Sequence, residues 1–139
     1  MSKQIKIDNG LMVYDVVNQN GTKIGEFSFN PYDTGLAKRF VEVLMNIGKM
    51  KSNFENNGDS LAGFIELQNE VEAQMIYLLG NESANVFFDV MGAFSLLPSG
   101  EFYIEHILSI IGKLLKDEAE KRKRAMEKKI SRHKEKYNK

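Results

Sequence analysis

The sequence predicts an α+β fold in a single domain: an N-terminal β-hairpin or small meander packed on about four α-helices, the last of them long and charged. Two patterns support this class. β-branched and aromatic residues dominate the first thirty residues around an Asn20-Gly21 dipeptide, which is typical of a hairpin turn. From residue 34 onwards, apolar residues recur with the period of a helix. The length of 139 residues fits one domain with its own core.

The hairpin is predicted from two segments. Residues 12–17 are β-branched and aromatic, and residues 23–29 alternate so that two phenylalanines share one face with Gly25. Ile24 falls on the opposite face unless Gly25 marks a β-bulge. Since an isolated hairpin is only marginally stable in water, we expect this sheet to pack against the helices.

The segment before the hairpin is a candidate for an additional strand. The Asn9-Gly10 dipeptide is a second candidate turn, because this pair favours two-residue hairpin loops. Such a turn would place Ile5 and Ile7 on one face of a short strand. That strand would extend the hairpin into the small meander.

The first helix is predicted to begin at Asp33 or Thr34, either of which can cap its free amides. Gly48 weakens the end of this helix, and the polar residues 51–58 are expected to form a connection. The helical spacing of its apolar stripe is seen at Leu36, Phe40, Val43, Leu44 and Ile47.

The second helix is predicted to follow a cap at Asp59 or Ser60, and Gly80 stands where a left-handed C-cap would end it. Residues 82–91 are predicted as a short third helix that Gly92 breaks.

The final helix is expected to be capped by Ser99, with Glu101 favourably placed in its first turn. Its apolar stripe thins beyond Leu115. A helix without an apolar stripe has no packing surface, so we expect residues 117–139 to project into solvent or fray.

The charges divide the chain into two parts. Residues 113–139 carry twelve Lys or Arg against five Asp or Glu, a net charge of about +7, whereas residues 1–112 carry seven against fourteen, about −7. The formal net charge of zero therefore hides an acidic body, residues 1–116, and a basic helical tail, residues 117–139. This polarity favours contact with other macromolecules, and it permits head-to-tail association of the tail with another acidic body.

No residue pattern predicts catalysis, and we predict no catalytic, metal-binding or cofactor-binding residue. The chain has no cysteine, which removes thiolate nucleophiles and zinc–thiolate sites. Its glycines match no phosphate-binding or nucleophile motif, and His106 is expected at a helix surface or at the boundary of the core. No segment resembles a signal peptide or reaches the ~20 apolar residues of a membrane span. These features favour the cytoplasm and no membrane partner.

Two groups of residues are candidates for binding a partner. In the loop before the last helix, Phe94, Leu96 and Leu97 either plug the core or form an adaptable apolar patch. In the tail, a run of basic residues contacts a protein partner, binds nucleic-acid phosphates, or is a solvated helix face without a partner. The tail candidates are Lys121, Arg122, Lys123, Arg124, Lys128, Lys129 and Arg132.

Two stretches carry a resemblance to a known group of proteins. They are Gly25-Glu26-Phe27-Ser28-Phe29-Asn30-Pro31-Tyr32-Asp33-Thr34 and residues 85–102, which include Asn-Val-Phe-Phe-Asp-Val-Met-Gly and Ser-Leu-Leu-Pro-Ser-Gly-Glu-Phe. With the Lys-rich end they resemble small prophage-encoded proteins of Gram-positive bacteria, which are similar to the tail assembly chaperones of long-tailed phages. The resemblance covers about residues 24–125, and the β-rich start departs from a purely helical pattern.

The resemblance implies a non-enzymatic role in virion morphogenesis. Tail assembly chaperones coat the long tape-measure protein until tail-tube subunits replace them, and they self-associate in the host cytoplasm. The implied partners are therefore a phage tape-measure or tail-tube protein and further copies of this chain, without a cofactor. The alternative is a nucleic-acid-binding regulator that uses the basic C-terminal helix.

Overall fold

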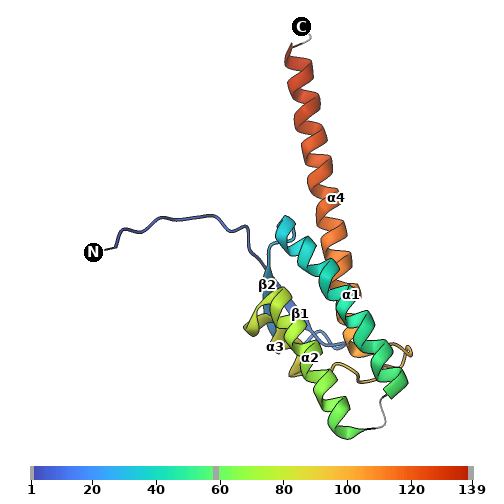
Figure 1. Ribbon diagram of the computed structural model, residues 1–139. Coiled ribbons are helices and arrows are strands. Elements are labelled where there is room, and N and C mark those ends of the chain that lie inside the picture. Colours follow the sequence, from blue (N-terminus) through green and yellow to red (C-terminus); the bar gives the residue numbers. More distant parts are fainter. Residues whose placement is uncertain (1, 58–59, 138–139) are drawn as a thin grey trace.

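The computed structural model folds as a two-stranded antiparallel hairpin followed by four helices, which confirms the predicted α+β class (Figure 1). It describes residues 2–57 and 60–137. The elements in chain order are β1 (Met12–Val17), β2 (Lys23–Phe29), α1 (Thr34–Asn57), α2 (Leu61–Leu79), α3 (Asn81–Phe88) and α4 (Tyr103–Tyr137).

The inner face of the hairpin is aromatic. Tyr14 lies opposite Phe27 in the register, and their ring centroids are 5.2 Å apart. Phe29 completes the cluster at 5.3 Å from Tyr14. Val16 pairs with Gly25 and Val17 pairs with Lys23, so Ile24 has no partner in β1. The structure therefore contains the β-bulge that was one of the two alternatives at this position. A β-bulge bends the strand that carries it and increases its local twist.

The hairpin loop is longer than the two-residue type I′ turn that Asn20-Gly21 favours. Gly21 has a positive φ of 81°, but no described non-glycine residue does, and type I′ needs positive φ at both positions. Instead, the Asn18 side-chain oxygen accepts hydrogen bonds from the N–H groups of Asn20 at 2.9 Å and Thr22 at 3.0 Å. This side chain organises the loop in place of the expected turn.

Residues 2–11 form no strand, so the predicted additional strand before the hairpin is wrong for this structure. They form an extended segment, here called the arm, that leads away from the body (Figure 1). Ile5 is 85% exposed and Ile7 is 78% exposed. The arm therefore adds nothing to the core of its own chain.

α1 begins where Asp33 caps it, since the carboxylate oxygen of Asp33 accepts from the N–H of Gly35 at 2.8 Å. The helix continues to Asn57, so the predicted connection over residues 51–57 is wrong, and residue 58 lies outside the described residues. The reason is tertiary. The ring of Phe54 stacks on that of Phe94 with centroids 4.8 Å apart, and this contact outweighs the polar composition of the segment.

α2 is capped as one of the alternatives predicted, because the Ser60 hydroxyl accepts from the N–H of Gly63 at 3.1 Å. The other candidate, Asp59, lies outside the described residues. Gly80 ends the helix as predicted, but its φ of 89° and ψ of 161° differ from those of the expected left-handed C-cap. α3 begins directly after it and ends at Phe88, three residues before the predicted end at 91.

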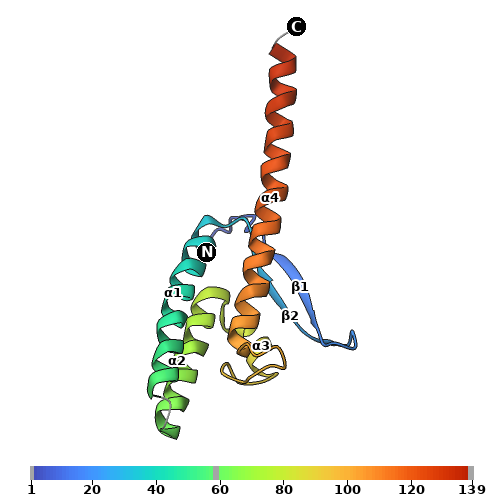
Figure 2. The same ribbon diagram turned by 90° about the vertical axis from the view of Figure 1, so that its right-hand side faces the viewer.

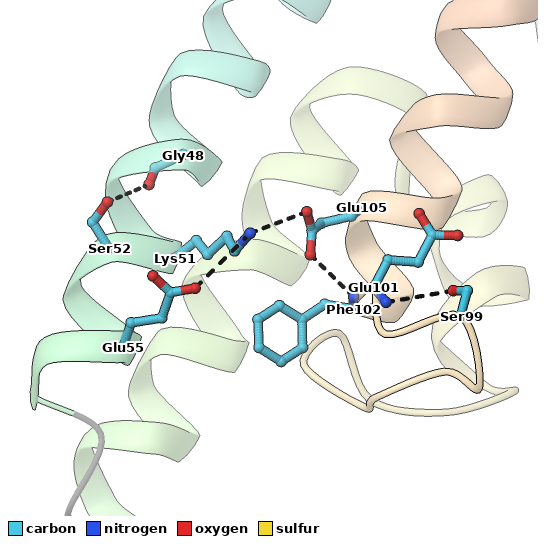
Figure 3. A network of polar contacts seen from close by, with 8 residues as sticks. All are labelled: Gly48, Lys51, Ser52, Glu55, Ser99, Glu101, Phe102 and Glu105. Atoms are coloured by element: carbon cyan, nitrogen blue, oxygen red, sulfur yellow. Dashed lines mark hydrogen bonds and ion pairs between the residues drawn. The ribbon is translucent and has the colours of Figure 1, made fainter.

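α4 begins at Tyr103 rather than after Ser99, so the predicted cap is wrong. The Ser99 hydroxyl accepts from the N–H of Glu101 at 3.4 Å in the loop before the helix. The helix start is closed by a side chain from its first turn, since the N–H of Phe102 donates to Glu105 at 3.0 Å (Figure 3). Lys51 of α1 lies 3.1 Å from the other oxygen of Glu105. These contacts hold the pKa of Glu105 below its usual value, chiefly through the Phe102 hydrogen bond.

The core lies between the hairpin, α1, α2, α3 and the first half of α4. Three isoleucines of α4, at positions 104, 107 and 111, are no more than 1% exposed. They share the core with residues of β2, α1, α2 and α3, and partly buried residues of β1 pack against it. The core residues of these elements include Phe27, Phe29, Leu36, Val43, Val71, Met75, Leu78 and Phe87.

Replacing Ile111 by Ala should lower the free energy of unfolding by about 2–5 kcal/mol, because the side chain is fully buried and its removal leaves a cavity. Ile130→Ala, on the exposed half of the same helix, should change it by less than about 0.5 kcal/mol. Urea unfolding followed by circular dichroism measures both. Equal losses at the two positions would contradict this division of α4.

Candidate functional site: the projecting half of α4

α4 is fixed to the body by a polar cluster at the point where it leaves the core. The hydroxyl of Tyr32 donates to a carboxylate oxygen of Glu118 at 2.7 Å, and Glu118 is only 9% exposed. Lys121 lies 3.4 Å from the second oxygen of Glu118, and the guanidinium of Arg122 lies 5.1 Å from the Tyr32 ring centroid. These four side chains, here called the Tyr32 clamp, set the direction in which α4 continues.

The neighbours of Glu118 in the Tyr32 clamp favour its charged form. The hydrogen bond from Tyr32 is the main cause that lowers the pKa of Glu118, and Lys121 adds to it, against the opposing effect of burial. The same hydrogen bond raises the pKa of the Tyr32 hydroxyl. Glu118 is therefore held as a carboxylate, which is the form that binds both neighbours.

Beyond the clamp, α4 stands clear of the body in both views (Figures 1 and 2). Every residue from 119 to 136 is exposed, and this stretch contains nine Lys or Arg against three Asp or Glu. The expected projection of the tail therefore holds for its described part, as a continuous helix. Contact with the body extends to Arg122, past the predicted boundary at residue 116.

The predicted basic binding residues lie together on this helix. Two of them, Lys121 and Arg122, belong to the Tyr32 clamp. The others continue along α4 over three further turns, and all are exposed: Lys123, Arg124, Lys128, Lys129 and Arg132. A rigid helix presents these cations at fixed spacing, which suits an extended acidic partner.

The opposite end of the molecule is acidic. Between Lys51 and Lys113 the chain contains no Lys or Arg, and this segment includes the whole of α2 and α3. Glu66 and Glu70 of α2 are exposed. Both views place α2 at the end away from the projecting half of α4 (Figures 1 and 2). The two charged regions therefore do not neutralise each other within one chain.

The loop candidates are not brought together as one surface. Phe94 is 5% exposed, whereas Leu96 is 69% exposed, and Leu97 is partly buried against the core. Phe94 belongs to an aromatic group in which its ring lies edge-on to that of Phe102, with centroids 5.6 Å apart. Phe94 therefore plugs the core, which was one of the two interpretations of this loop. Of the three candidates, only Leu96 exposes most of its side chain to solvent.

An open groove, which the sequence did not predict, lies between the start of α1 and the projecting half of α4. Its volume is about 690 Å³, and its lining includes Tyr32, Ala37, Ala119, Met126 and Ile130. Met126 is 55% exposed and Ile130 is 53% exposed. The helical spacing of Ala119, Met126 and Ile130 in the sequence indicates that they share one face of α4. The opposite wall of the groove comes from the start of α1, and only the fold brings it beside them.

The described residues contain no group of three or more His, Cys, Asp or Glu side chains that could hold a metal ion. Among the same residues, no helix has both the length and the apolar character needed to cross a membrane. His106 is exposed and its Nδ1 lies 3.3 Å from a carboxylate oxygen of Glu101, as expected for a helix-surface histidine. Comparison with protein-family models, curated sequences and solved structures finds no match to this chain.

Replacing Tyr32 by Phe should raise the pKa of Glu118, because its main hydrogen-bond donor is removed. A carboxyl with a lowered folded-state pKa stabilises the fold above its unfolded pKa, and this contribution is lost as pH falls through the folded value. The stability difference between the parent and Tyr32→Phe should therefore be present at pH 7, begin to shrink near the ordinary value of 4.5, and vanish only below the lowered folded-state pKa. Carboxyl NMR titration and urea unfolding measure the two effects.

Tyr77→Phe is the matched control. Its hydroxyl donates to Glu42 at 2.9 Å on the α1–α2 surface, so its removal should leave the titration of Glu118 unchanged. An unaltered Glu118 pKa in Tyr32→Phe would show that the clamp does not form in solution.

Proposed function

We propose that this chain is a non-catalytic phage morphogenesis factor, a tail assembly chaperone that binds the tape-measure protein in the cytoplasm of a bacterial host. The resemblance of residues 25–34 and 85–102 suggests the family. The observation that carries the proposal is the projecting half of α4, an exposed basic helix on an otherwise acidic body. Such a helix is suited to binding a macromolecule rather than to turning over a small substrate.

The two stretches of the resemblance both position α4. The first contributes Tyr32, which holds Glu118. The second contributes the loop before α4, where the N–H of Tyr103 donates to Ser95 at 2.8 Å and its hydroxyl donates to the carbonyl of Phe87 at 2.7 Å. The stretches also contact each other, since the Phe27 and Phe87 ring centroids are 5.2 Å apart. Because both stretches contact α4 and help to fix its direction, they support a function located on the projecting helix.

The groove beside the Tyr32 clamp suits a helical client whose apolar side chains recur once per turn along one face. Apolar side chains of Met126 and Ile130 line it, and Arg122 and Lys123 also belong to its lining. A helix laid in a groove is held by apolar anchors one turn apart, while flanking charges set its direction. A tape-measure protein, as a long helical chain, would offer such faces repeatedly along its length.

The test is an affinity pull-down of the tagged chain from its native host after prophage induction, with nuclease treatment and mass spectrometry. The parent should recover a very long helix-rich protein or tail-tube subunits. Met126→Glu with Ile130→Glu should reduce that recovery at least tenfold, because the groove loses its apolar floor. Val41→Glu with Met45→Glu, on the outer face of α1 at 55% and 62% exposure, is the control and should recover as much as the parent.

Recovery of nuclease-sensitive partners alone would reject the chaperone proposal. If the groove variant and the parent recover the same amount of client, the chain binds a client, but at a surface other than this groove.

A nucleic-acid-binding regulator is the second candidate, and the exposed run of cations on α4 favours it. Replacing Arg124, Lys128, Lys129 and Arg132 by Gln should then weaken DNA or RNA binding and flatten its salt dependence by ~0.9 for each phosphate that the variant no longer neutralises. Lys38→Gln with Lys49→Gln, exposed on α1, is the matched control. Fluorescence anisotropy across a salt series measures both, and the absence of salt-sensitive binding by the parent would remove this candidate.

A further inference from the structure

The hairpin has one covered edge and one open edge. On the outer edge of β2, the N–H of Ser28 donates to the hydroxyl of Ser83 in α3 at 3.1 Å. α3 also covers the inner face of β2, where a Cβ added to Gly25 would be 2.9 Å from a methyl of Val86. The outer edge of β2 is therefore occupied by the chain itself.

The edge of β1 is open. In an antiparallel pair, residues that bond across the pair alternate with residues whose N–H and C=O point outward. Ser28 points outward to α3, and its partner in the register is Val13. Val13 and Asp15 therefore direct their backbone groups away from β2. Within the described residues, no other segment hydrogen-bonds to them. An unpaired edge of this kind is a template for another strand.

The arm has the length and pattern of the missing strand. Residues 3–8 match the six residues of β1, and exposed Ile5 and Ile7 flank Lys6 in strict alternation. Antiparallel pairing with Lys6 opposite Val13 would use the outward groups of β1. It would place both isoleucines on the face that carries the aromatic cluster, since alternate residues share a face. It would also bring Lys6 next to Asp15, the charged residue of this edge.

The arm of the same chain is directed elsewhere. A tight Asn9-Gly10 turn needs positive φ at both residues, but of these two only Gly10 has it, at 64°. Instead, the side-chain amide of Asn30, directly after β2, donates to the carbonyl of Asn9 at 3.1 Å. This bond holds the base of the arm beside the end of β2 while the arm leads away from the body (Figure 1).

We propose that residues 3–8 of one chain add as an antiparallel strand to the β1 edge of a second copy. Strand exchange preserves the pairing that one chain could make with itself, and it converts an exposed arm and an open edge into one sheet. The proposal defines a self-association interface on the hairpin. It does not depend on the client or on the projecting half of α4, so its test and that of the proposed function fail independently.

The test uses the absence of cysteine from the chain. Lys6→Cys and Val13→Cys are introduced together, since directly opposed residues in a hydrogen-bonded pair lie about 5.5 Å apart at Cα, within disulfide range. On mild oxidation, at least half of the protein should migrate as a reducible dimer or larger ladder on a denaturing gel. Lys3→Cys with Val13→Cys is the control, and its disulfide yield should be at least tenfold lower because the register is wrong.

The other outcomes overturn the proposal. A monomeric band without free thiols would mean that the arm closes on its own β1 edge. A monomeric band with both thiols free would mean that the arm docks on neither edge. Mixing the two single-cysteine chains provides a check, because a heterodimer forms only if the arm reaches a second copy.

A second measurement leaves the hairpin unaltered. Ile5→Asp with Ile7→Asp removes the apolar face of the arm, and the exposure of both side chains means that folding of the single chain is not affected. Its self-association constant by sedimentation should be at least tenfold weaker than that of the parent. Val41→Asp with Leu61→Asp, at 55% and 75% exposure, is the matched control and should associate like the parent. Equal association of the arm variant and the parent would reject the interface.

Discussion

The fold depends on the burial of one face of α4. Ile104, Ile107 and Ile111 lie in the centre of the core, and the hairpin, α1, α2 and α3 all contribute residues to the same apolar cluster. None of these elements has enough apolar surface to be stable alone, and the hairpin least of all. The apolar stripe of α4 stops near Leu115, so the helix can be a shared centre in its first half and a free rod in its second.

The Tyr32 clamp lies at the transition between these halves. Glu118 is the last buried residue of α4 up to residue 136, and a buried carboxylate is tolerated only because Tyr32 and Lys121 satisfy it. Lys51 and Glu105 form the corresponding contact at the helix start. A long helix held at two separated points cannot swing as a flexible tail. Its charged half is therefore presented in a defined direction relative to the hairpin and the acidic α2.

The prediction from sequence succeeded where local patterns decide the structure. Asp33, Ser60 and Gly80 act through their immediate neighbours, and the helical and strand periods fixed the fold class. It failed where distant contacts override local preference. Phe54 keeps residues 51–57 helical by stacking on a loop forty residues away, and Glu105 displaces Ser99 as the cap of α4. The basic residues of the candidate site were predictable as a run. The groove beside them was not, because α1 supplies one of its walls.

The separation of charge means that the molecule does not behave as a neutral particle, although its formal net charge is zero. The exposed stretch from residue 119 to 136 is about 27 Å long as a helix, several times the Debye length of about 8 Å at physiological ionic strength. Each end is therefore screened from the other and acts as an independent ion. At a pH near the sequence isoelectric point of 6.7, the protein presents an anionic surface to an anion exchanger and a cationic rod to a cation exchanger. Retention on both resins, rather than on neither, is the behaviour that this shape dictates.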